Sequence, residues 1–130
     1  MTFTIPGPLH SYHETRSSSG WAGKGRRRTH FRTDAYHESQ RTIRLLANVA
    51  RIPDRILDTQ YAALTVAIYW SGRARMDASN AVKWIEDALF VEDRRILELH
   101  VTMCEHAGEE RADVRVDILG TSRPRASLAP

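Results

Sequence analysis

The sequence predicts an α+β fold in which a small mixed β-sheet of about four strands carries two helices, in the order β-α-β-α-β-β. Short segments with alternating apolar residues are interleaved with two longer segments whose apolar residues recur at helical spacing. The 130 residues suit one domain and leave no room for a second. We therefore expect a single domain over residues 1–130, with a frayed tail over residues 120–130.

The first half of the chain is expected to hold one strand and one helix. Residues 2–6 alternate polar and apolar side chains and stop at a proline, which is typical of an edge strand. Residues 7–33 are rich in Gly, Ser, Arg and His and are expected to form a long, basic, mobile loop. Thr33 or Asp34 can cap the helix that follows, which runs to about residue 51.

The second half is expected to hold three strands and a short helix. Residues 60–69 are mostly apolar on both faces, which predicts a central strand covered on both sides. Ser79 is expected to cap a short helix that ends near Leu89. Residues 96–104 carry alternating apolar residues on one face, and residues 114–118 form the last strand. We expect these two strands to pair with each other as a hairpin.

Cysteine content and hydropathy indicate the compartment. Cys104 is the only cysteine, so an intrachain disulfide cannot form, and a reducing compartment is the simplest interpretation. No apolar run approaches the roughly 20 residues that a membrane-spanning helix needs, and no secretory signal is visible. We expect a soluble, cytoplasmic protein with neither a membrane partner nor a small-molecule substrate.

Charge is distributed unevenly, although the net charge is only +3. Residues 1–33 contain six basic side chains and one acid, whereas residues 76–120 contain eleven acids and five bases. A basic arm on an acidic body suits a protein that grips a polyanion, because arginine pairs with phosphate in a bidentate manner. A solvated arm without a partner fits the same pattern. The candidate DNA-binding residues are Lys24, Arg26, Arg27, Arg28, Arg32, Arg73 and Arg75.

Residues suited to metal and phosphate chemistry gather around the second helix. They are Asp77, Asn80, Lys83, Asp87, Glu92 and Asp93. Asp77 lies at the helix entrance, and a loop after so short a helix can bring Asp93 back towards it. Convergent carboxylates hold Mg²⁺, or Mn²⁺ in its place, for phosphodiester hydrolysis, and Lys83 can neutralise charge that develops on the phosphate. On spacing alone, a solvated helix face explains the same residues.

This stretch resembles the signature of the RusA family of Holliday junction resolvases. That signature has a basic approach, Asp-x-Asp-Asn, a Lys three residues later, Asp-Ala-Leu and a later acidic pair. Its members here are Asp77, Asn80, Lys83, the run Asp87-Ala88-Leu89 and the pair Glu92-Asp93, and the opening Phe3-Thr4-Ile5-Pro6-Gly7 is also similar to the family's start. The resemblance implies a homodimer that binds four-way DNA junctions in recombination and repair and makes paired nicks, with a metal cluster in each subunit.

In that resemblance Asp77 and Asp93 are the catalytic metal ligands, Glu92 is an auxiliary ligand and Lys83 faces the phosphate. The sequence departs from the signature at Ser79, which stands where the family has its second Asp and supplies a hydroxyl instead of a carboxylate. The link between the helix and the acidic pair is also shorter. Two alternatives remain: a junction-binding module with weakened or absent catalysis, and an interaction protein whose basic arm binds RNA or an acidic partner.

Overall fold

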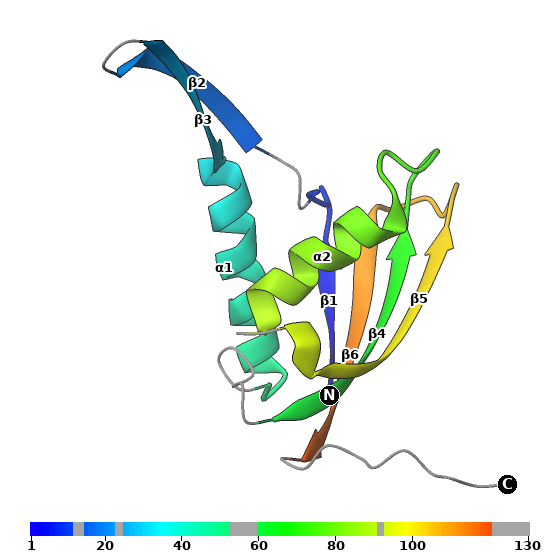
Figure 1. The fold of residues 1–130 in the computed structure, drawn as a ribbon. Helices are drawn as coiled ribbons and strands as arrows, with labels where there is room; N and C mark the ends of the chain where they lie inside the picture. Colours follow the sequence, from blue (N-terminus) through cyan, green and yellow to red (C-terminus); the bar gives the residue numbers. More distant parts are fainter. Residues whose placement is uncertain (12–14, 23–24, 53–59, 91–92, 121–130) are drawn as a thin grey trace, which may run out of the picture.

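A computed structural model of the chain describes residues 1–11, 15–22, 25–52, 60–90 and 93–120 (Figure 1). Over these residues a four-stranded mixed sheet carries two helices, so the predicted fold class and element order are confirmed. The elements are β1 (Thr2–Pro6), β2 (Thr15–Ala22), β3 (Gly25–Arg32), α1 (Asp34–Val49), β4 (Tyr61–Tyr69), α2 (Ala78–Leu89), the 3-10 helix η1 (Asp93–Arg95), β5 (Ile96–Cys104) and β6 (Arg111–Gly120).

The strand order of the sheet is β1-β6-β4-β5. β5 runs parallel to β4, and β6 pairs antiparallel with both β4 and β1. The predicted hairpin between β5 and β6 is therefore wrong, because β4 lies between them. The crossover through α2 brings β5 back beside β4 in the parallel sense. On the other side of β4, Ala112, Val114 and Val116 of β6 become fully buried under the helices.

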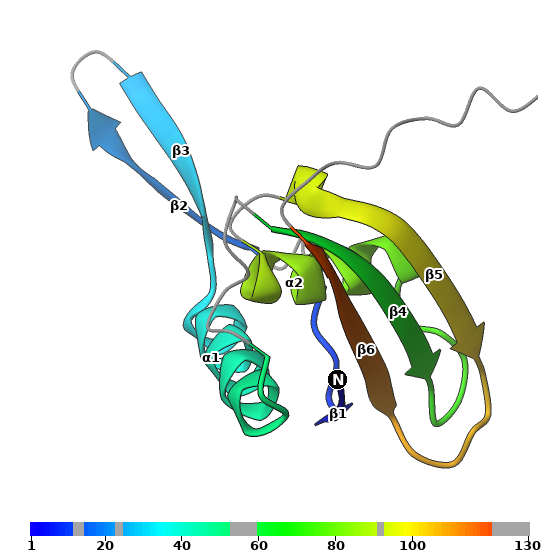
Figure 2. The same cartoon turned by 90° about the horizontal axis from the view of Figure 1, so that it is seen from below.

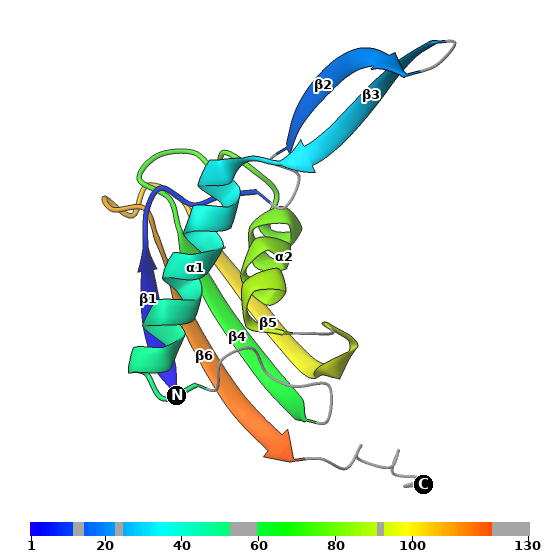
Figure 3. The same cartoon turned by 90° about the vertical axis from the view of Figure 1, so that its left-hand side faces the viewer.

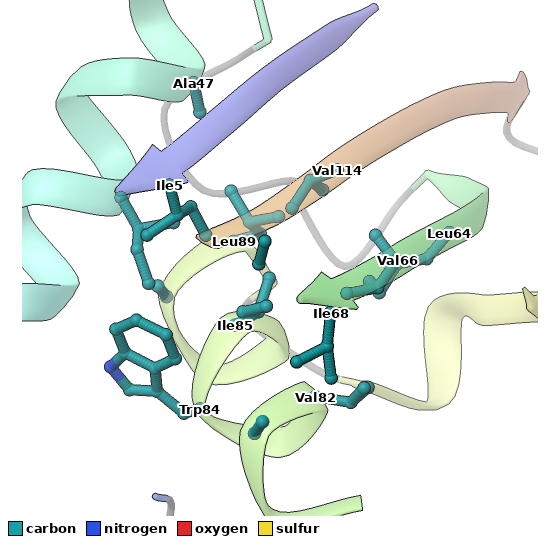
Figure 4. Packing of buried hydrophobic residues seen from close by; sticks show 14 of the residues in the cluster. Ile5, Ala47, Leu64, Val66, Ile68, Val82, Trp84, Ile85, Leu89 and Val114 are labelled. Atoms are coloured by element: carbon teal, nitrogen blue, oxygen red, sulfur yellow. The ribbon is translucent and has the colours of Figure 1, made fainter. Parts of the chain in front are cut away.

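Both helices cover the same face of the sheet (Figures 2 and 3). Leu64, Val66 and Ile68 of β4 point into this layer and are buried, whereas Thr65 on the opposite face is exposed. The expectation that β4 would be covered on both faces is therefore wrong: the second face is formed by small and polar side chains and meets solvent. Figure 4 shows Val82 and Ile85 of α2 beside Ile68 of β4, at the centre of the core.

The helix caps follow local chemistry. Thr33 caps α1 as predicted, and its Oγ1 accepts a hydrogen bond from the backbone N–H of Tyr36 at 3.1 Å. The cap of α2 is Asp77 and not Ser79, which lies inside the first turn. The reason is in the backbone: Asp77 is extended, and its carbonyl already accepts from the N–H groups of Asn80 and Ala81.

The segment predicted as a mobile loop contains a β-hairpin. β2 and β3 pair antiparallel from Thr15↔Arg32 to Ala22↔Gly25, and they extend beyond the helices (Figure 3). Residues 23–24 separate the strands, which is the spacing of the shortest common hairpins, and β-forming aromatic and β-branched residues occur in both. Residues 121–130, which hold nearly all of the predicted tail, lie outside the described part of the chain.

Neither helix of the described residues is long and apolar enough to cross a bilayer, and the longer one, α1, has 16 residues.

Candidate functional site

The largest hollow near the predicted site opens at the N-terminus of α2. It has a volume of about 740 Å³, and its lining includes the side chains of Asp77 and Asn80. The carboxylate of Asp77 is exposed and makes no capping hydrogen bond with its own helix. The remaining lining residues are Leu9, Ser11, Ala74, Arg75, Met76 and Met103. The structure thus brings together two of the predicted site residues, both with oxygen atoms, in one open cavity.

Glu110 fixes one wall of this cavity. Its backbone carbonyl accepts from the N–H of Gly7 at 2.9 Å, and its Oε2 accepts from the N–H of Leu9 at 2.9 Å. A Cβ atom at Gly7 would stand 2.8 Å from that carbonyl oxygen, so only glycine permits this approach. The wall is therefore set by the segment after β1 and by Glu110, at the start of β6.

Arg75 completes the same wall. Its guanidinium donates to Oε1 of Glu110 at 2.8 and 3.0 Å and to the carbonyl of Leu9 at 3.1 Å. It also lies over the ring of the buried Trp70, 5.3 Å from the centroid. Glu110 therefore offsets much of the charge of Arg75, whose described contacts are structural. Arg73, the other basic residue predicted to contact DNA here, is exposed.

Lys83 lies one turn further along α2 from Asn80 and is half-buried outside the cavity lining, as is the exposed Ser79. Glu86, on the next turn, is buried, and this burial raises the pKa of its carboxyl group while the charge of Lys83 opposes the shift. A buried, ionisable Glu86 beside Lys83 is a feature that sequence spacing did not single out. Only its position within the apolar half of the helix could have indicated it.

Asp87 turns away from the cavity and links the two helices. Its Oδ2 accepts from Nε2 of Gln40 at 2.7 Å and from the hydroxyl of Tyr36 at 3.4 Å. Gln40 also donates to the Tyr36 hydroxyl at 3.1 Å, and both α1 residues are buried. Trp84 adds a parallel link, its Nε1 donating to Oγ of Ser39 at 2.9 Å. In the structure Asp87 therefore acts in helix packing and stands apart from the carboxylate that lines the cavity.

The described part of one chain does not bring Asp93 to Asp77. Asp77 begins α2 after the end of β4, whereas Asp93 begins η1 just before β5. Because β4 and β5 are parallel, these positions lie at opposite ends of the sheet, and the 12 residues of α2 rise about 18 Å. Among the described residues no three His, Cys, Asp or Glu side chains gather as a metal cluster. Glu92 lies outside the described residues.

The basic residues predicted to grip DNA are located on the hairpin. Arg26, Arg27, Arg28 and Arg32 all lie on β3, and Lys24 falls outside the described residues. The hairpin precedes α1 and extends away from the sheet (Figures 1 and 3). Four arginine positions within one strand form an extended basic element, separate from the acidic body of the domain.

No protein-family model matches the sequence, and no curated protein is significantly similar to it.

The chemistry available in the cavity is that of a hard-cation and phosphate site. Carboxylate and amide oxygens, completed by water and substrate phosphate, are ligands that Mg²⁺ prefers, and one or two carboxylates are the usual protein share. The cavity supplies one carboxylate, from Asp77, and one amide oxygen, from Asn80. It also opens at a helix N-terminus, where the partial positive charge of the helix favours anions. The donor set therefore fits a divalent cation, at the lower end of ligand number.

Proposed function

We propose that this protein is a Mg²⁺-dependent endonuclease that cleaves branched DNA at four-way junctions. The observation that carries the proposal is the pairing of Asp77 and Asn80 in one open cavity at the start of α2. These two residues belong to the stretch that resembles the RusA signature. An uncapped, exposed carboxylate beside an amide is suited to holding a divalent cation against a phosphodiester.

Each residue at this end of α2 has a part in the proposed reaction. Asp77 and Asn80 would hold the cation, which when bound supplies Lewis-acid polarisation of the phosphate and an activated water. Lys83 would lower the cost of charge developing on the phosphate oxygens. Arg75, held by Glu110 at 2.8 Å, would keep the cavity wall rigid. Asp87 would support this end of the site only indirectly, through the packing of α2 on α1.

Junction binding is assigned to the basic hairpin. Phosphate contacts from β3 would add to those of Arg73, and recognition would depend on backbone charge and junction shape. Such binding weakens steeply with salt, because each neutralised phosphate releases counterions. A junction has approximate two-fold symmetry, so a two-fold dimer would present two sites to opposed strands.

A second candidate function is junction binding without catalysis. The observation that favours it is the single carboxylate in the cavity: Ser79 replaces the family's second Asp, and Asp93 starts an element at the far end of α2. A site with one carboxylate holds Mg²⁺ less tightly than a site with two or three.

Cleavage of a labelled four-way junction separates these functions. The wild-type protein and Ser79→Asp are incubated with the junction or with a linear duplex of matched sequence, with Mg²⁺, with Mn²⁺ or with chelator. The proposal expects metal-dependent paired nicks in the junction by the wild-type protein and little cutting of the duplex. Junction binding without cutting, with cleavage gained in Ser79→Asp, would establish the second candidate. Equal binding of junction and duplex without cutting would refute both.

A further inference from the structure

The β5 edge of the sheet carries an apolar strip that nothing in the chain covers. Leu99, Val101 and Met103 pair in register with Leu64, Val66 and Ile68 of β4, so they point to the helix-bearing face. The β4 residues are buried, but the β5 residues are 47%, 36% and 43% exposed. α2 covers β4 and stops short of β5, which lies at the outer edge in Figure 1.

The backbone of β5 is as open as its side chains. The carbonyl of Cys104 accepts from the N–H of Trp70 and so points inwards. Because backbone polar groups alternate along a strand, those of Leu99, Val101 and Met103 point to the free edge. The opposite edge strand, β1, is five residues long and ends in Pro6, whereas β5 has nine residues without a proline. A long apolar edge without such protection pairs readily with another strand.

We propose that a second copy of this chain pairs antiparallel with β5 about a two-fold axis at His100. His100 is the middle residue of β5, so this register uses the whole strand. Leu99 then lies opposite Val101 of the partner subunit, and Met103 lies opposite Leu97 of the partner subunit. Every apolar residue of the strip meets another apolar residue, and the outward backbone groups form the hydrogen-bonded pairs.

Charge complementarity favours the same occupant. β5 is preceded by Arg94 and Arg95 in η1 and followed by Glu105. In the antiparallel register Arg95 comes opposite Glu105 of the partner subunit, so the basic start of each strand meets the acidic end of the other. Parallel pairing would instead place like charges side by side.

This pairing changes the composition of the candidate site. Met103, at the end of β5, lines the cavity that contains Asp77. The start of the partner's β5, and with it the η1 segment that begins at Asp93, therefore lies beside that cavity. The two acidic positions that one chain holds at opposite ends of α2 come together across the dimer. The catalytic meaning of this shared site rests on the proposed function, whereas the pairing itself does not.

Cysteine cross-linking tests the pairing. In a Cys104→Ser background, His100→Cys places two thiols on the axis at a non-hydrogen-bonded pair, where Cα atoms are about 4.5 Å apart, within the disulfide range of about 4.4–6.8 Å. Thr65→Cys is the matched control, because Thr65 is exposed on the same face and pairs with His100 one strand further in. Mild oxidation should give a covalent dimer of His100→Cys and leave Thr65→Cys monomeric on non-reducing gels. A folded His100→Cys protein that stays monomeric, or equal cross-linking of both variants, overturns the pairing.

Subunit mixing tests the shared site. Asp77→Asn and Asp93→Asn are each expected to lose junction cleavage, and their mixture should regain nicking, because one of the two composite sites in the mixed dimer keeps both carboxylates. A wild-type protein that cleaves, with no regained nicking in the mixture, overturns the shared site. If the wild-type protein does not cleave, the proposed function fails, and the cross-link still decides the pairing.

Discussion

Replacing Asp87 by alanine tests whether this residue links the two helices. The substitution removes the acceptor of the 2.7 Å bond from Gln40 and leaves that amide, on a side chain only 6% exposed, with the Tyr36 hydroxyl alone. A hydrogen bond to a charged group contributes about 1.5–3 kcal/mol. The carboxylate itself is exposed, so solvent screening lowers the expected loss to about 1–2 kcal/mol.

The assay is equilibrium urea unfolding of the wild-type protein, Asp87→Ala, Gln40→Leu and the double variant. Leucine fills the space of the buried amide without leaving a polar group unsatisfied, so the cycle isolates the pair. We expect a coupling energy of about 1 kcal/mol with unchanged dependence on urea. A coupling below about 0.3 kcal/mol, which is the usual scatter for independent sites, would refute the link.

Three further substitutions test other parts of the structure. Thr33→Ala should cost about 1 kcal/mol of unfolding free energy by removing the α1 cap, and Thr33→Ser should restore it; equal stability of the two variants would contradict the cap. Leu64→Ala should cost about 2–5 kcal/mol, whereas Leu45→Ala, at a position 66% exposed, should change stability by less than about 0.5 kcal/mol. Burial raises the pKa of Glu86 above its ordinary 4.5, so the folded state holds this proton more tightly than the unfolded state and loses that stabilisation as pH rises through the raised pKa. Glu86→Gln should therefore match the wild-type stability near pH 4 and exceed it progressively towards neutral pH, unlike the exposed control Glu109→Gln; a difference that is independent of pH would contradict this assignment.

The local elements were largely predictable, because they depend on short-range chemistry. Alternation of apolar residues located β1, β4 and β5, and the hydroxyl of Thr33 marked the start of α1. The pairing of strands was not predictable in the same way. Whether β6 pairs with β5 or with β4 depends on where the helices lie, and only the layer above the sheet decides which strand is buried.

The candidate site was predictable in its residue types and only partly in its geometry. The position of Asp77 at the entrance of α2 followed from the sequence, and the cavity it shares with Asn80 agrees with the predicted grouping. The role of Asp87 did not follow, because its spacing from Asn80 places it on the same side of an isolated helix. The position of Gln40, which interrupts the apolar stripe of α1, was the available signal: a buried amide needs a polar partner, and Asp87 is that partner.

The central claim is that Asp77 is the catalytic carboxylate of a junction endonuclease, and single-turnover cleavage at saturating protein tests it most directly. Asp77→Asn is compared with Asp117→Asn, which removes a carboxylate that pairs with Arg115 on the surface of the sheet. With equal junction binding by both variants, the account expects Asp77→Asn to lose at least a hundredfold in rate, on the order of one essential catalytic group, and Asp117→Asn to cleave like the wild-type protein. Undiminished metal-dependent cleavage by Asp77→Asn would contradict the account.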